Sequence, residues 1–161
     1  MDNKNVNLKI VLVEPMIPPN TGNIARLCAA NGFDLCLVGK LGFTLDDKHL
    51  KRAGLDYWDH VRLSTYNNFD DFVLSQTGTT GAKPRCFFFT KKAETSIFDV
   101  EFKNGDILVF GPEDKGFSED FLARYKEHLI RVPMQTENVR SLNLSSTVAI
   151  ATYEAMRQIK R

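Results

Sequence analysis

The chain has 161 residues, an apolar fraction of 43% and a formal net charge of only +1. This length and composition suit one globular domain, residues 1–161, that buries a real core. The balanced charge excludes a chain-wide basic footprint, so any RNA contact has to come from local patches or from a surface built by two subunits.

Three cysteines, Cys28, Cys36 and Cys86, stand among apolar neighbours and show no CxxC spacing. We interpret them as buried free thiols in a reducing compartment, and we expect no metal site. The first residues are too polar for a signal peptide, and the longest apolar runs are too short to cross a bilayer. The sequence therefore predicts a cytoplasmic protein with no membrane partner.

Short apolar runs alternate with amphipathic stretches, which is the pattern of βαβ units. Such apolar strands predict an α/β fold whose mostly parallel sheet has helices on both faces. We expect residues 76–84 to form a surface loop within the domain. In chain order, the predicted elements are strand Lys9–Val13, helix 21–31, strand 35–38, helix 45–52, a short edge strand 61–63, helix 68–74, strand 85–89, strand Ile107–Phe110, helix 118–126, strand 129–132 and helix 145–160.

The first predicted helix has clear boundary signals in the sequence. Two prolines precede it, Asn20 or Thr21 is expected as its N-cap, and Gly32 follows its end. The fourth helix is expected to start at Ser118, and acidic residues fill its first turn, where they favour the helix dipole.

Segment 14–26 joins the first strand to the first helix, at the edge where ligands bind in α/β sheets. Asn23 and Arg26 project away from the apolar stripe of that helix. Beside a helix N-terminus they form a natural site for a phosphate of RNA. The alternative is a proline-stopped loop with an arginine on a solvated helix face.

Segment 110–116 (FGPEDKG) follows an apolar strand and leads into a helix. Gly111 lets the backbone approach a ligand closely, and Pro112 stiffens the turn. The segment is neither GxGxxG nor a P-loop, which disfavours a dinucleotide or nucleoside triphosphate site. A plain β–α turn is the alternative.

Segment 130–145 ends a strand at Pro133 and, after a polar loop, opens the last helix. Its Ser141, Asn143 and Ser145 are suited to helix capping and also to contacts with a neutral base or sugar.

Established catalytic motifs such as GxSxG and HExxH do not occur in the sequence. An enzyme built from these residues has to act by binding and orientation, and methyl transfer from a sulfonium donor fits that demand. The densest basic cluster, residues 48–52, is the best candidate for phosphate contacts outside the active centre, although such clusters are usually solvated helix faces.

Taken together, the motifs resemble the SPOUT methyltransferases, specifically the small tRNA wobble-position ribose 2′-O-methyltransferases. The resemblance covers residues 8–159, and the motifs are specific because they occur in order and at compatible spacing. They are EPMIPPNTGNIARLCA (14–29), DDKHLKRAGLDYW (46–58), FGPEDKG (110–116), IRVPM (130–134) and RSLNLSSTVAIATYEA (140–155).

The resemblance implies a C-terminal trefoil knot, a homodimer and S-adenosyl-L-methionine as cofactor. It implies methyl transfer to the ribose 2′-OH of a cytidine or uridine at the wobble position of tRNA. By position, the cofactor contacts of the family fall on Phe89, Thr90, Gly111, Glu113, Val132, Met134, Ser141, Leu142, Asn143 and Ser145.

Arg26 matches the arginine that the family is proposed to use in deprotonating the 2′-OH. Because a guanidinium stays protonated in proteins, we instead expect Arg26 to hold a phosphate and to stabilise the developing alkoxide. Asn23, Ser141 and Asn143 are expected to orient the ribose. For RNA binding we expect Lys48, Lys51, Arg52 and Tyr153, the last on an exposed stripe of the final helix that also suits a dimer interface.

Two other functions remain open at this point. One is ribose methylation of ribosomal RNA, although relatives of that kind often carry an additional N-terminal RNA-binding domain. The other is a non-catalytic RNA-binding module, which would show no saturable binding of S-adenosylmethionine in a calorimetric titration.

Overall fold

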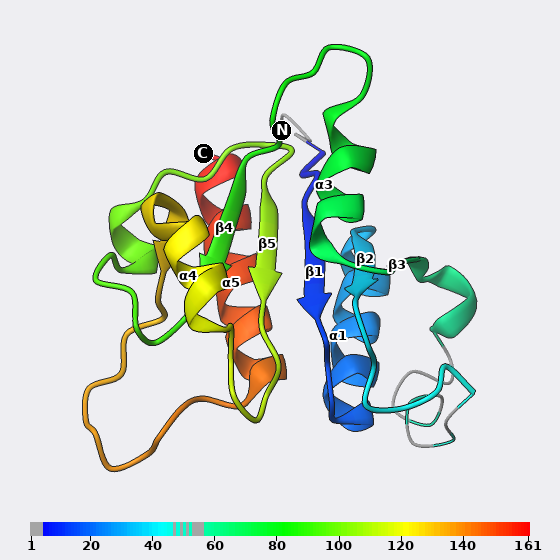
Figure 1. Ribbon diagram of the computed structural model, residues 1–161, viewed down its shortest axis with the longest axis horizontal. Coiled ribbons are helices and arrows are strands. Elements are labelled where there is room, and N and C mark those ends of the chain that lie inside the picture. Colours follow the sequence, from blue (N-terminus) through cyan, green and yellow to red (C-terminus); the bar gives the residue numbers. More distant parts are fainter. Residues whose placement is uncertain (1–4, 47, 49, 51, 53–56) are drawn as a thin grey trace.

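The computed structural model describes residues 5–46, 48, 50, 52 and 57–161, and it contains a six-stranded parallel sheet (Figure 1). The strand order is β3-β2-β1-β5-β4-β6, and every pairing is parallel, so all carboxyl ends meet at one edge. The strands are β1 (Lys9–Val13), β2 (Asp34–Val38), β3 (Arg62–Tyr66), β4 (Cys86–Phe89), β5 (Ile107–Phe110) and β6 (Leu129–Ile130).

Helices cover both faces of the sheet, as the sequence predicted. The α-helices are α1 (Pro18–Asn31), α3 (Phe69–Thr77), α4 (Glu119–Arg124) and α5 (Leu144–Ile159). Short 3₁₀ turns are η1 (Trp58–His60), η2 (Ile97–Asp99) and η3 (Lys126–His128). Figure 1 shows α3 and α4 in front of the sheet and α1 with α5 behind it.

Two separate hydrophobic clusters hold these layers together. Behind the sheet, α1 and α5 pack against each other and against alternate residues of β1, β2 and β5. In front, α3 and α4 bury an aromatic group in which the rings of Phe88 and Tyr125 stack with centroids 4.3 Å apart. All of β5 is buried, because both of its faces lie under helices.

The start of α1 differs from the prediction. The N-cap position belongs to Ile17, and Pro18 and Pro19 occupy the first helical positions. Proline suits that place because its missing N–H would have no helical partner there. Asn20 and Thr21 are therefore buried inside the first turn, and the prediction that one of them is the N-cap was wrong. Gly32 ends the helix in a left-handed conformation, as expected.

Other element boundaries in the structure differ from the predicted ones by a few residues. β6 stops at Ile130 because the backbone of Arg131 exchanges hydrogen bonds with residues 95 and 97. β3 extends to Tyr66 and lies at the sheet edge, as expected for the short predicted strand 61–63. The predicted helix 45–52 lies partly outside the described residues. Of its described positions, Lys48, Leu50 and Arg52 are helical and Leu50 is fully buried.

The cysteines are free; Cys28 and Cys36 are buried and Cys86 is half-buried. Burial raises the pKa of the Cys28 and Cys86 thiols to about 12 and that of Cys36 to about 11, so all three are poor nucleophiles. Within the described part of the chain, no group of ligating side chains could hold a metal ion. None of its helices is long and apolar enough to cross a membrane.

Candidate functional site

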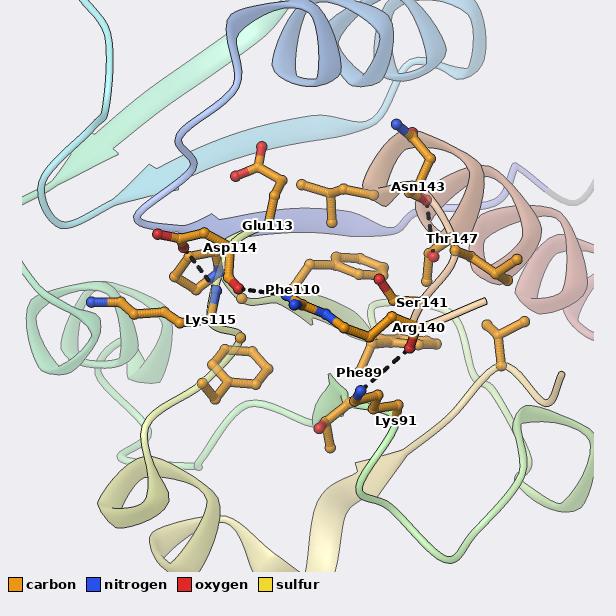
Figure 2. Close-up of a pocket in the computed structure, with 18 of the residues that line it drawn as sticks. Phe89, Lys91, Phe110, Glu113, Asp114, Lys115, Arg140, Ser141, Asn143 and Thr147 are labelled. Carbon is orange, nitrogen blue, oxygen red and sulfur yellow. Dashed lines mark hydrogen bonds between the residues drawn. The ribbon is translucent and has the colours of Figure 1, made fainter. Parts of the chain in front are cut away.

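A cavity of about 500 Å³ opens at the carboxyl edge of the sheet (Figure 2). Three loops surround it: the segment after β4, the loop 111–117 after β5, and the segment 132–144 between β6 and α5. Ile17 and Asn20, at the start of α1, complete the lining. The cavity thus lies where parallel α/β sheets place their ligands.

The floor of the cavity is aromatic. The rings of Phe89 and Phe110, the last residues of β4 and β5, stack with centroids 4.6 Å apart and an interplanar angle of 15°. Apolar side chains of Val132, Met134 and Leu142 lie around them, and all of these are part of the cavity lining. Flat apolar walls of this kind suit a planar heteroaromatic group.

Gly111 allows the loop after β5 to fold back on itself. A Cβ atom at this position would lie 3.0 Å from the Phe117 backbone nitrogen and 3.1 Å from the Gly116 carbonyl carbon. A larger residue would require the Gly116–Phe117 backbone to shift by a few tenths of an ångström. This glycine therefore permits the close packing of the loop.

Glu113 ties this loop to the segment before α1. Its carboxylate accepts hydrogen bonds from the backbone N–H of Met16 at 2.7 Å and of Ile17 at 3.2 Å. The next two residues are prolines and have no N–H to offer, and the amides of Asn20 and Thr21 bond to the Ile17 carbonyl. The start of α1 is thus already occupied by a carboxylate of the chain, so its backbone amides are not free to bind a phosphate.

Asn20 connects the same segment to the third loop. Its side chain is only 6% exposed, and its amide nitrogen lies 3.5 Å from a Glu113 carboxylate oxygen. The Asn143 amide donates to the Asn20 side-chain oxygen at 3.1 Å. Asn143 is also the N-cap of α5 and accepts from the backbone N–H of Ser145. Glu113, Asn20 and Asn143 therefore bridge the three segments that meet at the cavity.

The sequence pattern predicted Asn20 only as a possible helix cap. The pair of prolines is the signal that could have indicated its buried position, since prolines at the first two helical positions place the next residue inside the helix.

Charged side chains fasten the loops over the cavity. Lys91 donates to the Arg140 carbonyl at 3.3 Å, and the Arg140 guanidinium donates to the Asp114 carbonyl at 3.2 Å, both drawn in Figure 2. Lys92 pairs with Glu119 at the start of α4. The segment 134–143 is thus linked to both neighbouring loops.

Nearly all the residues predicted for the cofactor meet in this cavity. Ser145 does not line it; its hydroxyl donates to the Asn143 side-chain oxygen at 2.6 Å and supports that side chain. The predicted residues that line the cavity are Phe89, Thr90, Gly111, Glu113, Val132, Met134, Ser141, Leu142 and Asn143.

The predicted catalytic pair on α1 lies outside the cavity lining. Asn23 and Arg26 are exposed, and the Arg26 guanidinium lies over the Tyr57 ring, 4.8 Å from its centroid. Of the predicted RNA contacts, Lys48 and Arg52 are exposed away from the cavity lining, and Lys51 lies outside the described residues. Tyr153 is 54% exposed on α5.

Known proteins share this sequence and fold over almost their whole length. The chain is 45% identical over 150 residues to a tRNA (cytidine(34)-2′-O)-methyltransferase of Burkholderia cenocepacia (strain HI2424), covering 92% of this chain and 94% of that protein. A solved structure concerned with 2-OH methylation of C/U34 on tRNA matches with a TM-score of 0.87 and 44% identity, covering 96% of this chain and 97% of that one.

A more distant solved structure, an AdoMet-bound rRNA methyltransferase from Sinorhizobium meliloti, has a TM-score of 0.81 at 24% identity. It covers 94% of this chain and 56% of that one, and at this identity the likeness concerns the fold alone. Residues 7–153 match the SpoU rRNA Methylase family. The resemblance found in the motifs is thereby confirmed, and the chain belongs to the SpoU methylase family.

Proposed function

We propose that the protein transfers a methyl group from S-adenosylmethionine to the ribose 2′-OH of the wobble nucleotide, a cytidine or uridine, in tRNA. The observation that carries this proposal is the 45% identity to a tRNA (cytidine(34)-2′-O)-methyltransferase along almost the full length of both chains. The solved structure on C/U34 methylation supports the same substrate.

The residues around the cavity fit S-adenosylmethionine. A volume of about 500 Å³ lies in the usual range for small-molecule sites. The Phe89–Phe110 stack offers a flat wall for an adenine, and Ser141 and Asn143 add polar groups. When bound, the cofactor supplies a methyl group already activated by its positive sulfur. The protein then has to align the acceptor and exclude water.

Arg26 is the candidate side chain for contact with the target nucleotide. Along α1 it lies six residues beyond Asn20, which corresponds to about 9 Å at 1.5 Å per residue. The family resemblance supports its role, which is to grip a phosphate and stabilise charge on the ribose, while Asn23, Ser141 and Asn143 orient the sugar. The guanidinium cannot serve as a base, so the 2′-OH proton leaves to a phosphate oxygen or to water.

We also propose that the protein is a homodimer that docks through α1 and α5. These helices pack side by side behind the sheet, so their outward faces form one surface. On α5, Ile150 and Tyr153 are 41% and 54% exposed, whereas Ala151 and Ala155 face the core. An exposed aromatic beside an exposed isoleucine is typical of an interface core. A second copy of the chain is the occupant that we propose for this surface.

The C-terminal trefoil knot and a cytoplasmic location complete the proposal. The knot is carried over from the SPOUT resemblance. Consistent with it, β6 lies at the sheet edge beside β4, whereas α5 packs beside α1 behind the sheet, so segment 131–143 has to cross the carboxyl edge. A cytoplasmic location follows from the tRNA substrate.

Methyl incorporation into separate pools of tRNA and ribosomal RNA, with labelled S-adenosylmethionine, tests the proposed substrate. We expect label in tRNA only. Label in ribosomal RNA alone would contradict the tRNA substrate and would indicate ribose methylation of ribosomal RNA. If calorimetric titration showed no saturable binding of S-adenosylmethionine, the proposal that the protein is a methyltransferase would be contradicted.

A further inference from the structure

Arg26 differs from the other arginines that lie over aromatic rings in the described part of the chain. Arg85 lies over Phe87 and also pairs with Asp106, and Arg124 lies over Tyr125 and also pairs with Asp70. Arg26 lies over the Tyr57 ring at 4.8 Å, and no carboxylate among the described residues pairs with it. Among the described residues, the Tyr57 ring is therefore the contact that holds the Arg26 guanidinium.

Tyr57 is itself well anchored. It directly precedes η1, and its carbonyl accepts a hydrogen bond from the His60 backbone N–H at 2.9 Å. The next residue, Trp58, packs against the hydrophobic cluster behind the sheet, and η1 lies against α1. The ring is therefore carried by a turn that is fixed to the same helix as Arg26.

A ring face holds a guanidinium in a different way from a carboxylate. An ion pair would occupy the N–H donors and neutralise the charge, whereas stacking limits the side chain to fewer conformations and leaves its planar edge of donors free. A guanidinium held in this way is ready to bind a phosphate or a developing alkoxide, because it does not first have to leave a carboxylate.

We propose that Tyr57 is a positioning residue that holds Arg26 ready for the RNA substrate; this inference rests on the function proposed above. It acts through its ring and not through its hydroxyl. The structural role of the turn belongs to Trp58, which packs against the core, and so the ring of Tyr57 can be exchanged without loss of the fold.

A double-mutant cycle on single-turnover methyl transfer, with saturating S-adenosylmethionine and tRNA, tests the proposal. Tyr57→Leu should slow transfer by about 3- to 30-fold, the range that a cation–π contact spans. Tyr57→Phe and Tyr57→Trp, which keep the ring, should transfer at nearly the wild-type rate. In an Arg26→Ala background, Tyr57→Leu should have no further effect.

Arg124→Ala is the matched control, since it removes another ring-stacked arginine that does not line the cavity, and its rate should equal wild type. Unfolding midpoints and S-adenosylmethionine affinity should be the same for all ring variants. An unchanged rate in Tyr57→Leu, or equal slowing with and without Arg26, would overturn the inference. So would a wild-type rate in Arg26→Ala. No methylation of tRNA by the wild-type protein would instead contradict the proposed function.

Discussion

Arg26 is exposed on α1, so its contributions to stability and to transfer can be separated. Replacing an exposed helical arginine by alanine typically changes the free energy of unfolding by less than about 0.5 kcal/mol. We expect Arg26→Ala to slow single-turnover methyl transfer by roughly 10²–10³-fold, as for other fixed donors that stabilise developing charge. Arg26→Lys should restore only part of the rate, because an ammonium lacks the planar fork.

Parallel titration with S-adenosylmethionine is the control for Arg26, and the cofactor affinity of Arg26→Ala should equal that of the wild type. A lower affinity with an unchanged rate at saturation would assign Arg26 to the cofactor instead.

A different prediction concerns Glu113, because its carboxylate connects the loop after β5 to the segment before α1. The amides of Met16 and Ile17 donate to different oxygens of Glu113, so Glu113→Gln removes the charge and also replaces one of the two acceptors by an NH2 group that cannot accept. Charge-assisted bonds are roughly twice as strong as neutral ones, so the free energy of unfolding should fall by about 1 kcal/mol, with weaker cofactor binding. Chemical denaturation and calorimetry measure both effects.

Asp114→Asn is the matched control for Glu113, since this exposed carboxylate accepts from the N–H of its own neighbour, Lys115, and from no other of the described residues. Equal losses of stability and of cofactor affinity in the two variants would show that the removal of one negative charge, and not the loop contact, is responsible.

Sequence patterns could name most of the cavity but not its internal connections. Gly111 follows a strand and Ser141 precedes a helix, so their place at the carboxyl edge was predictable, whereas Phe89 was assigned to the site by the family resemblance alone. The link from Glu113 through Asn20 to Asn143 joins residues up to 123 positions apart, which no local pattern reports. Tyr57 was likewise part of a recognised motif, but only the structure shows the arginine above its ring.

At the scale of elements, the end of α5 contains a pH-sensitive pair. Arg157 lies beside Glu154 and, with Gln158, holds the pKa of that carboxyl down at about 2, against an ordinary 4.5. Because the pKa is lowered in the folded state, the stabilisation is complete above pH 4.5 and is lost as the pH falls towards 2. Urea denaturation of wild type and Glu154→Gln should therefore show a stability difference that shrinks through this window. A stability difference that increased as the pH fell would contradict the stabilising role of the Glu154–Arg157 pair.

The exposed face of α5 predicts the oligomeric state. Tyr153→Ala removes an aromatic side chain from the centre of the proposed interface, and light scattering should show dissociation towards monomer. Phe98→Ala is the control, because Phe98 is 65% exposed and lies on η2, not on α1 or α5. A wild-type protein that is monomeric at micromolar concentration would exclude this dimer.

Elements with strong local signals were predicted nearly to the residue. The bounds of β1 and β5 agree because each is a short, almost unbroken apolar run. β6 was overestimated because Val132 continues the apolar pattern although the chain has already turned into the cavity wall. The first turn of α1 was missed because cap preferences favour Asn and Thr, whereas here the prolines start the helix.

At the scale of the whole molecule, composition and periodicity predicted a parallel sheet with two covered faces, and the structure confirms it. The strand order was not predictable in this way, because apolar runs such as β4 and β5 do not indicate which neighbour they join. The structure establishes the order, since the family resemblance implied a C-terminal knot but no particular strand order. The near-zero net charge agrees with a substrate surface concentrated in small patches.

The proposed activity is methylation of one particular hydroxyl of the tRNA. Two anticodon stem-loops that differ only in the 2′-OH of the wobble nucleotide, one with ribose and the other with deoxyribose, test this most directly with labelled S-adenosylmethionine. We expect transfer to the ribose form and none to the deoxyribose form. Equal labelling of the two would contradict it.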